Sequence, residues 1–118
     1  MEMVKLLIDH GARINARNPH GTPLSEAAAA NRLDVMRFLL EKGADIEGKD
    51  LGMAWTPLMR AADQGAVEAV RLLLENGADP YFKDYRGDTP MRIAEQKKHR
   101  GVAELLAEAT LNKRATPK

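Results

Sequence analysis

Apolar residues recur along this chain at helical spacing, in segments of roughly ten residues separated by polar stretches that contain glycine. The clearest segment is 67–74, where Val67, Val70 and Leu74 fall on one helical face, with Ala69 and Leu73 beside them. Such a one-sided pattern predicts a helix that packs through one face against a neighbour.

A shorter apolar segment comes just before this one and has its own start and stop signals. Thr56 can cap a helix with its hydroxyl, and Pro57 suits the first helical position, where a missing N–H costs nothing. Gly65 and Gly77 can each end a helix in a left-handed conformation. Residues 56–77 therefore predict a helix-turn-helix.

The same stretch recurs along the chain. Thr-Pro-Leu occurs at 22–24 and at 56–58, and Thr-Pro-Met follows at 89–91, with spacings of 34 and 33. Two apolar residues followed three positions on by Gly-Ala occur near 7–12, 39–44 and 73–78, and the Thr-to-Gly interval is 21 in both complete copies. Two independent landmarks at one interval predict a repeat architecture.

These motifs resemble ankyrin repeats, which have a period of about 33 residues and a Thr-Pro-Leu signature. The resemblance covers residues 2–109. It implies an all-α solenoid of stacked helix-turn-helix pairs with β-turn, hairpin-like connections. We expect one domain over 1–109, with an N-terminal half repeat at 2–10 and three complete helix pairs at 23–42, 57–76 and 90–109. Residues 110–118 are polar and basic and are expected to form a flexible tail.

Two helix-to-helix turns depart from the glycine that the family usually places there. Asn31 replaces it in the first complete pair, and Asn is the next-best residue for a left-handed conformation, so this turn should be preserved. Lys98 replaces it in the last pair, so that turn should be either strained or remodelled.

Composition narrows the classes of protein. The chain has 118 residues, a net charge of +1, no cysteine and no apolar run near the roughly 20 residues of a membrane helix. The first ten residues lack the basic start and apolar core of a secretory signal. We expect an intracellular, cytoplasmic protein that binds neither a membrane nor nucleic acid, because its helices carry as many acids as bases.

Catalytic and metal-binding patterns do not emerge. His10, His20 and His99 lie in different repeats without the spacing of a metal motif, and Ser25 lacks a nucleophile-elbow context. The glycines mark the repeats and do not form a phosphate-binding loop. We therefore predict no enzyme activity, no cofactor, no metal and no small-molecule substrate.

The resemblance implies protein–protein recognition through the tips of the connections and the concave face of the first helices. The partner itself is unidentified. Tip residues expected to contact a partner protein are Pro19 and His20 in the first connection, Leu51, Met53 and Trp55 in the second, and Tyr85, Arg86 and Asp88 in the third. Trp, Tyr and Arg are the types enriched in binding hot spots. In the alternative interpretation, Trp55 and Met53 fold inward as a lid over the helices.

On the concave face, the candidate binding residues are Arg60, Asp63 and Gln64. Glu26 and Arg60 occupy equivalent places in neighbouring first helices, within reach of one another, so a cross-repeat ion pair between them is one hypothesis. Two independent solvated charges are the alternative.

The N-terminal segment leaves another possibility open. Its apolar residues have no repeat on their outer side, so Met3, Val4 and Leu7 could form a homodimer contact and make the chain a self-associating scaffold. A truncated chain would explain the same pattern.

Overall fold

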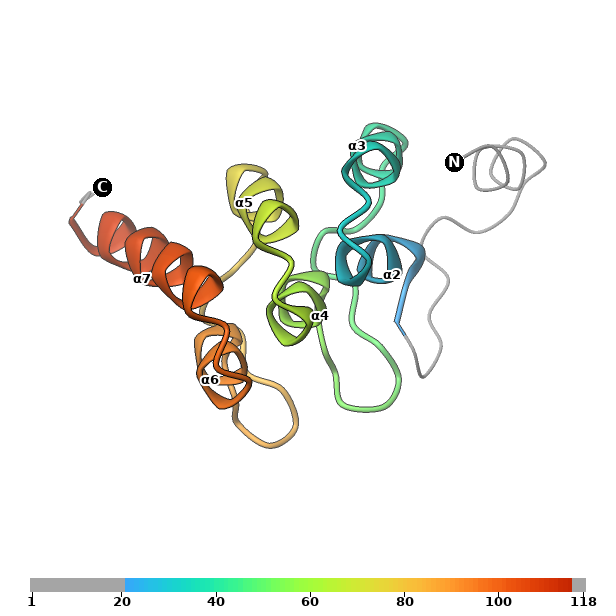
Figure 1. The fold of residues 1–118 in the computed structure, drawn as a ribbon. Helices are drawn as coiled ribbons and strands as arrows, with labels where there is room; N and C mark the ends of the chain where they lie inside the picture. The colour runs from blue at the N-terminus through green and yellow to red at the C-terminus, as the bar shows by residue number, and fades with distance from the viewer. Residues whose placement is uncertain (1–20, 116–118) are drawn as a thin grey trace.

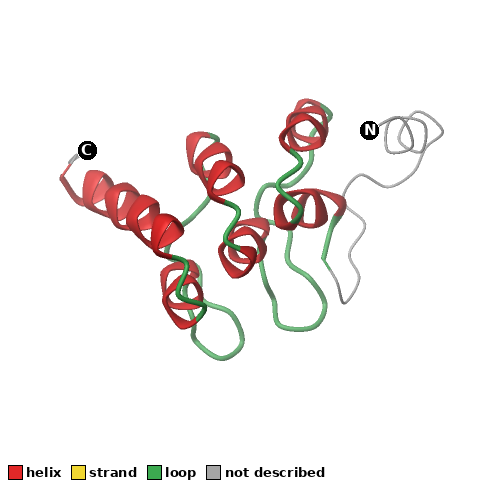
Figure 2. Cartoon of the chain, viewed as in Figure 1, coloured by secondary structure: helices red, strands yellow, loops and turns green. Residues whose placement is uncertain are grey.

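The computed structural model describes residues 21–115, and side chains over 21–110. Within that range every regular element is a helix, as Figure 2 shows. The six helices are α2 (Pro23–Ala29), α3 (Leu33–Glu41), α4 (Pro57–Gln64), α5 (Val67–Glu75), α6 (Pro90–Gln96) and α7 (Arg100–Ala115). They form three consecutive pairs, so the prediction of an all-α repeat fold is confirmed.

Each first helix of a pair begins in the same way. The hydroxyls of Thr22, Thr56 and Thr89 accept hydrogen bonds from the backbone N–H three residues on, at 3.2, 3.3 and 3.2 Å. The three threonines are extended, with ψ of 169°, 168° and 167°, and a proline follows each one. The repeated sequence therefore produces a repeated local structure.

The turn inside each pair is left-handed at one residue, which is Asn31 in the first pair, Gly65 in the second and Lys98 in the third. Their φ angles are 58°, 70° and 63°. Asn31 preserves the turn as predicted. Lys98 adopts the glycine conformation instead of remodelling the turn, which places the expected strain on its own backbone.

The pairs stack into two layers (Figure 1). The first helices α2, α4 and α6 form one layer, and the second helices α3, α5 and α7 form the other. Buried alanines on the first helices allow close approach, while buried leucine and valine from the second helices fill the space between layers. The members of this core include Ala28, Ala61, Ala62, Ala94, Leu39, Val70, Leu73, Val102 and Leu106.

The two layers are packed unequally. Neighbouring first helices approach each other more closely than neighbouring second helices do, most clearly for α2 with α4 against α3 with α5. A stack that is tighter on one side curves toward that side. The exposed side of the first helices is therefore the concave face.

The last helix differs from the prediction. We expected it to end at 109 and a flexible tail to follow, but α7 continues to Ala115. Residues 110–115 contain neither Gly nor Pro, so nothing in the local sequence stops the helix before Pro117. The hydroxyl of Tyr81 also donates to the carbonyl of Thr110 at 3.2 Å, which ties this turn to the preceding connection.

Several predictions concern the part of the chain outside the described residues. They are the half repeat at 2–10, the dimer contact through Met3, Val4 and Leu7, and the tip residues Pro19 and His20. These stay predictions. Within the described range, none of the helices has the length and apolar character to cross a membrane.

Candidate functional site

The connection between α3 and α4 is organised by one buried carboxylate. Asp50 Oδ1 accepts hydrogen bonds from the backbone N–H groups of Gly52, Met53, Ala54 and Trp55, at 2.9 to 3.2 Å. The N–H of Asp50 donates to the carbonyl of Trp55 at 2.9 Å and closes the loop. The tip of this connection is therefore held by its own side chain.

The connection between α5 and α6 repeats this plan in a loop that is one residue shorter. Asp84 Oδ1 accepts from the N–H groups of Arg86 and Asp88 at 2.8 and 2.9 Å. The N–H of Asp84 donates to the carbonyl of Asp88 at 3.0 Å. The extra residue of the earlier loop is absorbed near Ala54, which is left-handed with a φ of 64°.

The two connections are joined to each other. Trp55 Nε1 donates to Asp84 Oδ2 at 2.7 Å, and the N–H of Tyr85 donates to the carbonyl of Met53 at 3.1 Å. Burial by itself would raise the pKa of Asp84, but the hydrogen bonds from Asp88, Trp55 and Arg86 outweigh it and lower that pKa. The carboxylate therefore stays ionised and holds the indole.

Trp55 and Met53 are half-buried, and Trp55 packs against the core. The inward alternative of the sequence analysis thus describes the position of Trp55 in the structure. Three other predicted tip residues remain outside: Leu51 is 55% exposed, Tyr85 is 76% exposed, and the side chain of Arg86 is 59% exposed. We call Leu51, Tyr85 and Arg86 the tip cluster.

Asp88 has an internal role beside this cluster. Its carboxylate lies 3.5 Å from Arg86 Nη2 and 3.8 Å from Arg92 Nε, and its side chain is largely buried. It therefore orients two arginines and offers a partner little surface of its own. The first arginine belongs to the tip cluster, and the second lies in α6.

On the concave face, Arg60, Asp63 and Gln64 form the less buried side of α4. Asp63 is engaged within the molecule: Lys97 Nζ lies 3.2 Å from Oδ1, and Gln64 Nε2 donates to Oδ2 at 3.0 Å. His99 Nε2 lies 2.9 Å from the carbonyl oxygen of Asp63, which can only accept. This cluster joins α4 to the turn between α6 and α7.

The hypothesis of a Glu26–Arg60 ion pair is wrong. Among the ion pairs of the described residues none joins Glu26 to Arg60, Glu26 is exposed, and Arg60 Nε is buried without a hydrogen-bond partner. Glu26 and Arg60 occupy equivalent positions on α2 and α4, and these two helices pack against each other. Equivalent positions do not determine the rotamers of two long side chains that each lose entropy on pairing.

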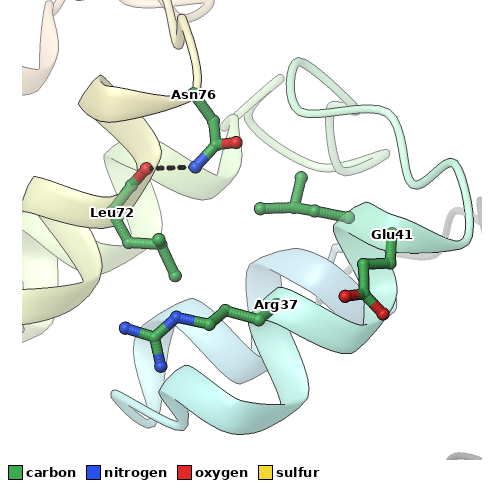
Figure 3. Close-up of a pocket in the computed structure, with 5 residues that line it drawn as sticks. Arg37, Glu41, Leu72 and Asn76 are labelled. Atoms are coloured by element: carbon green, nitrogen blue, oxygen red, sulfur yellow. Dashed lines mark hydrogen bonds between the residues drawn. The ribbon is translucent and has the colours of Figure 1, made fainter.

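A hollow of about 380 Å³ lies on the opposite side of the molecule, between α3 and α5. Figure 3 shows Arg37 extending from α3 toward Leu72 on α5, with Glu41 further along α3. Asn76, which caps the end of α5, donates to the carbonyl of Leu72 at 2.8 Å. Leu40 completes the lining. Sequence reasoning missed this feature, because it arises from the wider spacing of the second helices.

Sequence reasoning also missed two polar links between repeats. Asn31 donates to Glu68 Oε1 at 3.1 Å and accepts from the N–H of Ala69 at 3.0 Å. Glu47 Oε2 accepts from the N–H of Asp79 at 2.7 Å. Each link joins residues 32 to 38 positions apart, close to one repeat, and that interval was the available signal. Among the described residues no group of three His, Cys, Asp or Glu could hold a metal ion.

Comparisons with known proteins agree with this geometry. The family pattern described as "Ankyrin repeats (3 copies)" matches residues 1–50 and 47–116. The chain is 48% identical over 46 residues to the ankyrin repeat and KH domain-containing protein mask of Drosophila melanogaster. It is 40% identical over 50 residues to alpha-latrocrustotoxin-Lt1a of Latrodectus tredecimguttatus.

These matches cover 38% and 41% of this chain but only 1% and 4% of the two relatives, so the similarity is one of repeats. Ankyrin repeats are generally protein–protein interaction modules and typically have no enzymatic activity. With the family pattern matching nearly all of the sequence and three stacked helix pairs in the structure, the chain belongs to the ankyrin-repeat family.

Proposed function

We propose that this chain is a non-enzymatic recognition module that binds a partner protein through the tip cluster and the concave face. The observation that carries the proposal is the exposure of Leu51, Tyr85 and Arg86 on two connections that are hydrogen-bonded to each other. Large apolar and aromatic side chains that stay in solvent are available for contact.

The rigidity of the two connections supports this role. Asp50 and Asp84 occupy most of the backbone N–H groups at the tips, and the bond from Trp55 to Asp84 fixes one tip against the next. Association costs free energy when loops must be ordered, so tips that are already ordered lose less on binding. In this proposal Trp55 holds the two connections together, while the tip cluster contacts the partner.

The experiment is a selection of protein fragments from the source organism, displayed on yeast, against the purified chain. The selected fragments are then titrated against a Tyr85→Ala, Arg86→Ala double variant. A matched control, Tyr81→Ala with Arg71→Ala, removes the same residue types from exposed positions away from the tips. Circular dichroism verifies that both variants are folded.

We expect Kd to rise about 10-fold or more for the tip variant, because loss of two hot-spot side chains costs at least about 1.4 kcal/mol. The control should change Kd by less than about 2-fold, since exposed residues outside an interface contribute little. The proposal would be contradicted if both variants lost affinity equally. It would also be contradicted if the fragments bound the tip variant, the control and the unmodified chain with the same Kd.

A further inference from the structure

Arg60, on the concave side of α4, has no partner among the described residues. The residues around it in α4, from Pro57 to Met59 and then Ala61 and Ala62, are buried, whereas Arg60 is half-buried. Its Nε is buried and has no hydrogen-bond partner. Over the described residues its guanidinium forms no ion pair either.

The neighbouring charged side chains Arg92 and Asp63 each lie in an ion pair. The first helices carry two cations, Arg60 and Arg92, and Arg92 pairs with Asp88 at 3.8 Å. Asp63, three residues further along α4, has its Oδ1 3.2 Å from Lys97 Nζ, although this oxygen, like Arg60 Nε, is buried without a hydrogen-bond partner. An ionised donor that is partly withdrawn from water and left without an acceptor is unfavourable, by roughly 1–3 kcal/mol for each unmade hydrogen bond.

The missing group has a defined chemistry. Guanidinium is planar and presents a fork of N–H donors that matches the two oxygens of a carboxylate. A carboxylate supplied from outside would satisfy the donors that Asp63 and Glu26 leave unmet. Because this side of α4 is half-buried, such a pair would be screened less than one on an open surface.

Glu26 places a negative charge beside the positive charge of Arg60, so the two positions prefer opposite charges in a partner. It is exposed at the equivalent position of α2, and neighbouring packed helices lie about 8–10 Å apart. A partner that carried a second acid beside the first would meet this carboxylate. A Lys or Arg would be attracted to it.

We propose that the concave face recognises a protein segment that places an Asp or Glu carboxylate on Arg60 and a Lys or Arg on Glu26. The proposal rests on the protein-binding function proposed above and names the partner chemistry for the concave part of that surface. A segment that placed a Lys or Arg on Arg60 and an Asp or Glu on Glu26 would be repelled at both positions. The charge pattern therefore also excludes partners with that order of charges.

The test uses a random linear peptide library displayed on phage, so no natural partner is needed. It is selected in parallel against the unmodified chain, Arg60→Gln, a swapped variant carrying Glu26→Arg and Arg60→Glu, and the control Arg37→Gln. Arg37 is exposed on α3, so the control removes a cation from the convex side. Arg60→Gln removes the charge without adding an acid, and thermal unfolding verifies that each variant is folded.

Peptides selected on the unmodified chain should be enriched in one acid and one base and should bind Arg60→Gln at least about 10-fold more weakly, while Arg37→Gln changes Kd less than about 2-fold. The swapped variant should select peptides with the opposite charge order.

Peptides without an acid, or equal binding to the unmodified chain and Arg60→Gln, overturn the inference. If those peptides still lose binding to the tip variant Tyr85→Ala, Arg86→Ala, the proposed function stands without it. If they respond to neither set of changes, the proposed function fails as well.

Discussion

At the scale of single residues, the repeat requires a backbone conformation more strictly than it requires a residue type. Asn31, Gly65 and Lys98 all have a positive φ although their side chains differ. Glycine reaches this region without strain, asparagine does so with little cost, and lysine pays the penalty of its Cβ.

Lys98→Gly should therefore stabilise the protein. The left-handed conformation costs a non-glycine residue roughly 1–2 kcal/mol, and part of this gain is offset by the greater freedom of glycine in the unfolded chain. We expect a net gain of about 0.5–1 kcal/mol in urea unfolding. The control Lys42→Gly changes a helix-ending lysine at φ −87°, where glycine has no such advantage. A gain at Lys42 as large as at Lys98 would refute this reasoning.

Glu47 is a second residue whose surroundings determine how it affects the stability of the folded protein. Burial raises its pKa above the ordinary value of 4.5; the hydrogen bond from Asp79 opposes this, and the Asp79 and Asp45 carboxylates reinforce it. The folded protein thus holds this proton more tightly than the unfolded chain does. The resulting stabilisation is complete below pH 4.5. It is lost as the pH rises through the raised pKa that Glu47 has in the folded state.

Glu47→Gln should raise the free energy of unfolding at neutral pH, because glutamine keeps an acceptor for the Asp79 N–H and carries no charge. The difference from the unmodified chain should shrink toward zero as pH falls to about 4.5. Urea unfolding at both pH values measures it. Glu41→Gln, which removes a carboxylate from an exposed position of α3, is the matched control, and an equal gain there would contradict this reasoning.

At the scale of elements, the connections behave as structured parts of the fold. Asp50 and Asp84 each close a loop through backbone hydrogen bonds, and Trp55 joins the two loops. The tips are therefore stabilised by buried carboxylates and do not depend on a partner for their shape.

Trp55→Phe should destabilise the protein by about 1.5–3 kcal/mol, since the ring is largely kept but the charged Asp84 loses its indole donor. Urea unfolding followed by circular dichroism measures this change. Tyr81→Phe is the matched control because it also removes one side-chain hydrogen bond, at an exposed position, and should cost under about 0.5 kcal/mol. Equal costs would show that the Trp55–Asp84 bond adds no more stability than the exposed bond of Tyr81.

The same bond predicts a response to acid. The pKa of Asp84 is lowered from 3.8, so the stabilisation it supplies is present above 3.8 and is lost as pH falls through the lower value in the folded state. The emission of Trp55, the single tryptophan, should therefore change only below pH 3.8. In an Asp84→Asn variant this acid-dependent step should be absent.

At the scale of the whole molecule, stability is distributed along a one-dimensional stack in which each pair contacts its neighbours. Leu73 lies in the middle described pair and Leu106 in the last, and both are fully buried. Their truncation removes similar contacts but at different places in the stack.

Leu73→Ala should lower the free energy of unfolding by about 2–5 kcal/mol and loosen every described helix, because the middle pair supports both neighbours. Leu106→Ala should speed amide hydrogen exchange mainly in α6 and α7, while α2 to α4 stay protected. Hydrogen exchange resolved by residue distinguishes the two cases. Uniform loss of protection in the Leu106 variant would mean that the stack unfolds as a single unit.

The local repeat was predictable from the sequence because its determinants act over a few residues. A threonine hydroxyl caps the N–H three positions on, a left-handed residue ends a helix, and apolar residues at helical spacing define a buried face. For the same reason the first two pairs were predicted to end at Lys42 and Asn76, which are the residues that cap α3 and α5.

Only the tertiary structure decided which polar side chains meet. The partner of Trp55 is a carboxylate 29 positions away, and Asp63 is held by Lys97. Among the described residues Arg60 and Glu26 form no ion pair, although their repeat positions suggested one. Such contacts depend on rotamers and on the spacing of stacked helices, which local sequence does not constrain. The chain's own sequence therefore determined that it is a stack of repeats, and packing between repeats determined which of its surface residues are left for a partner.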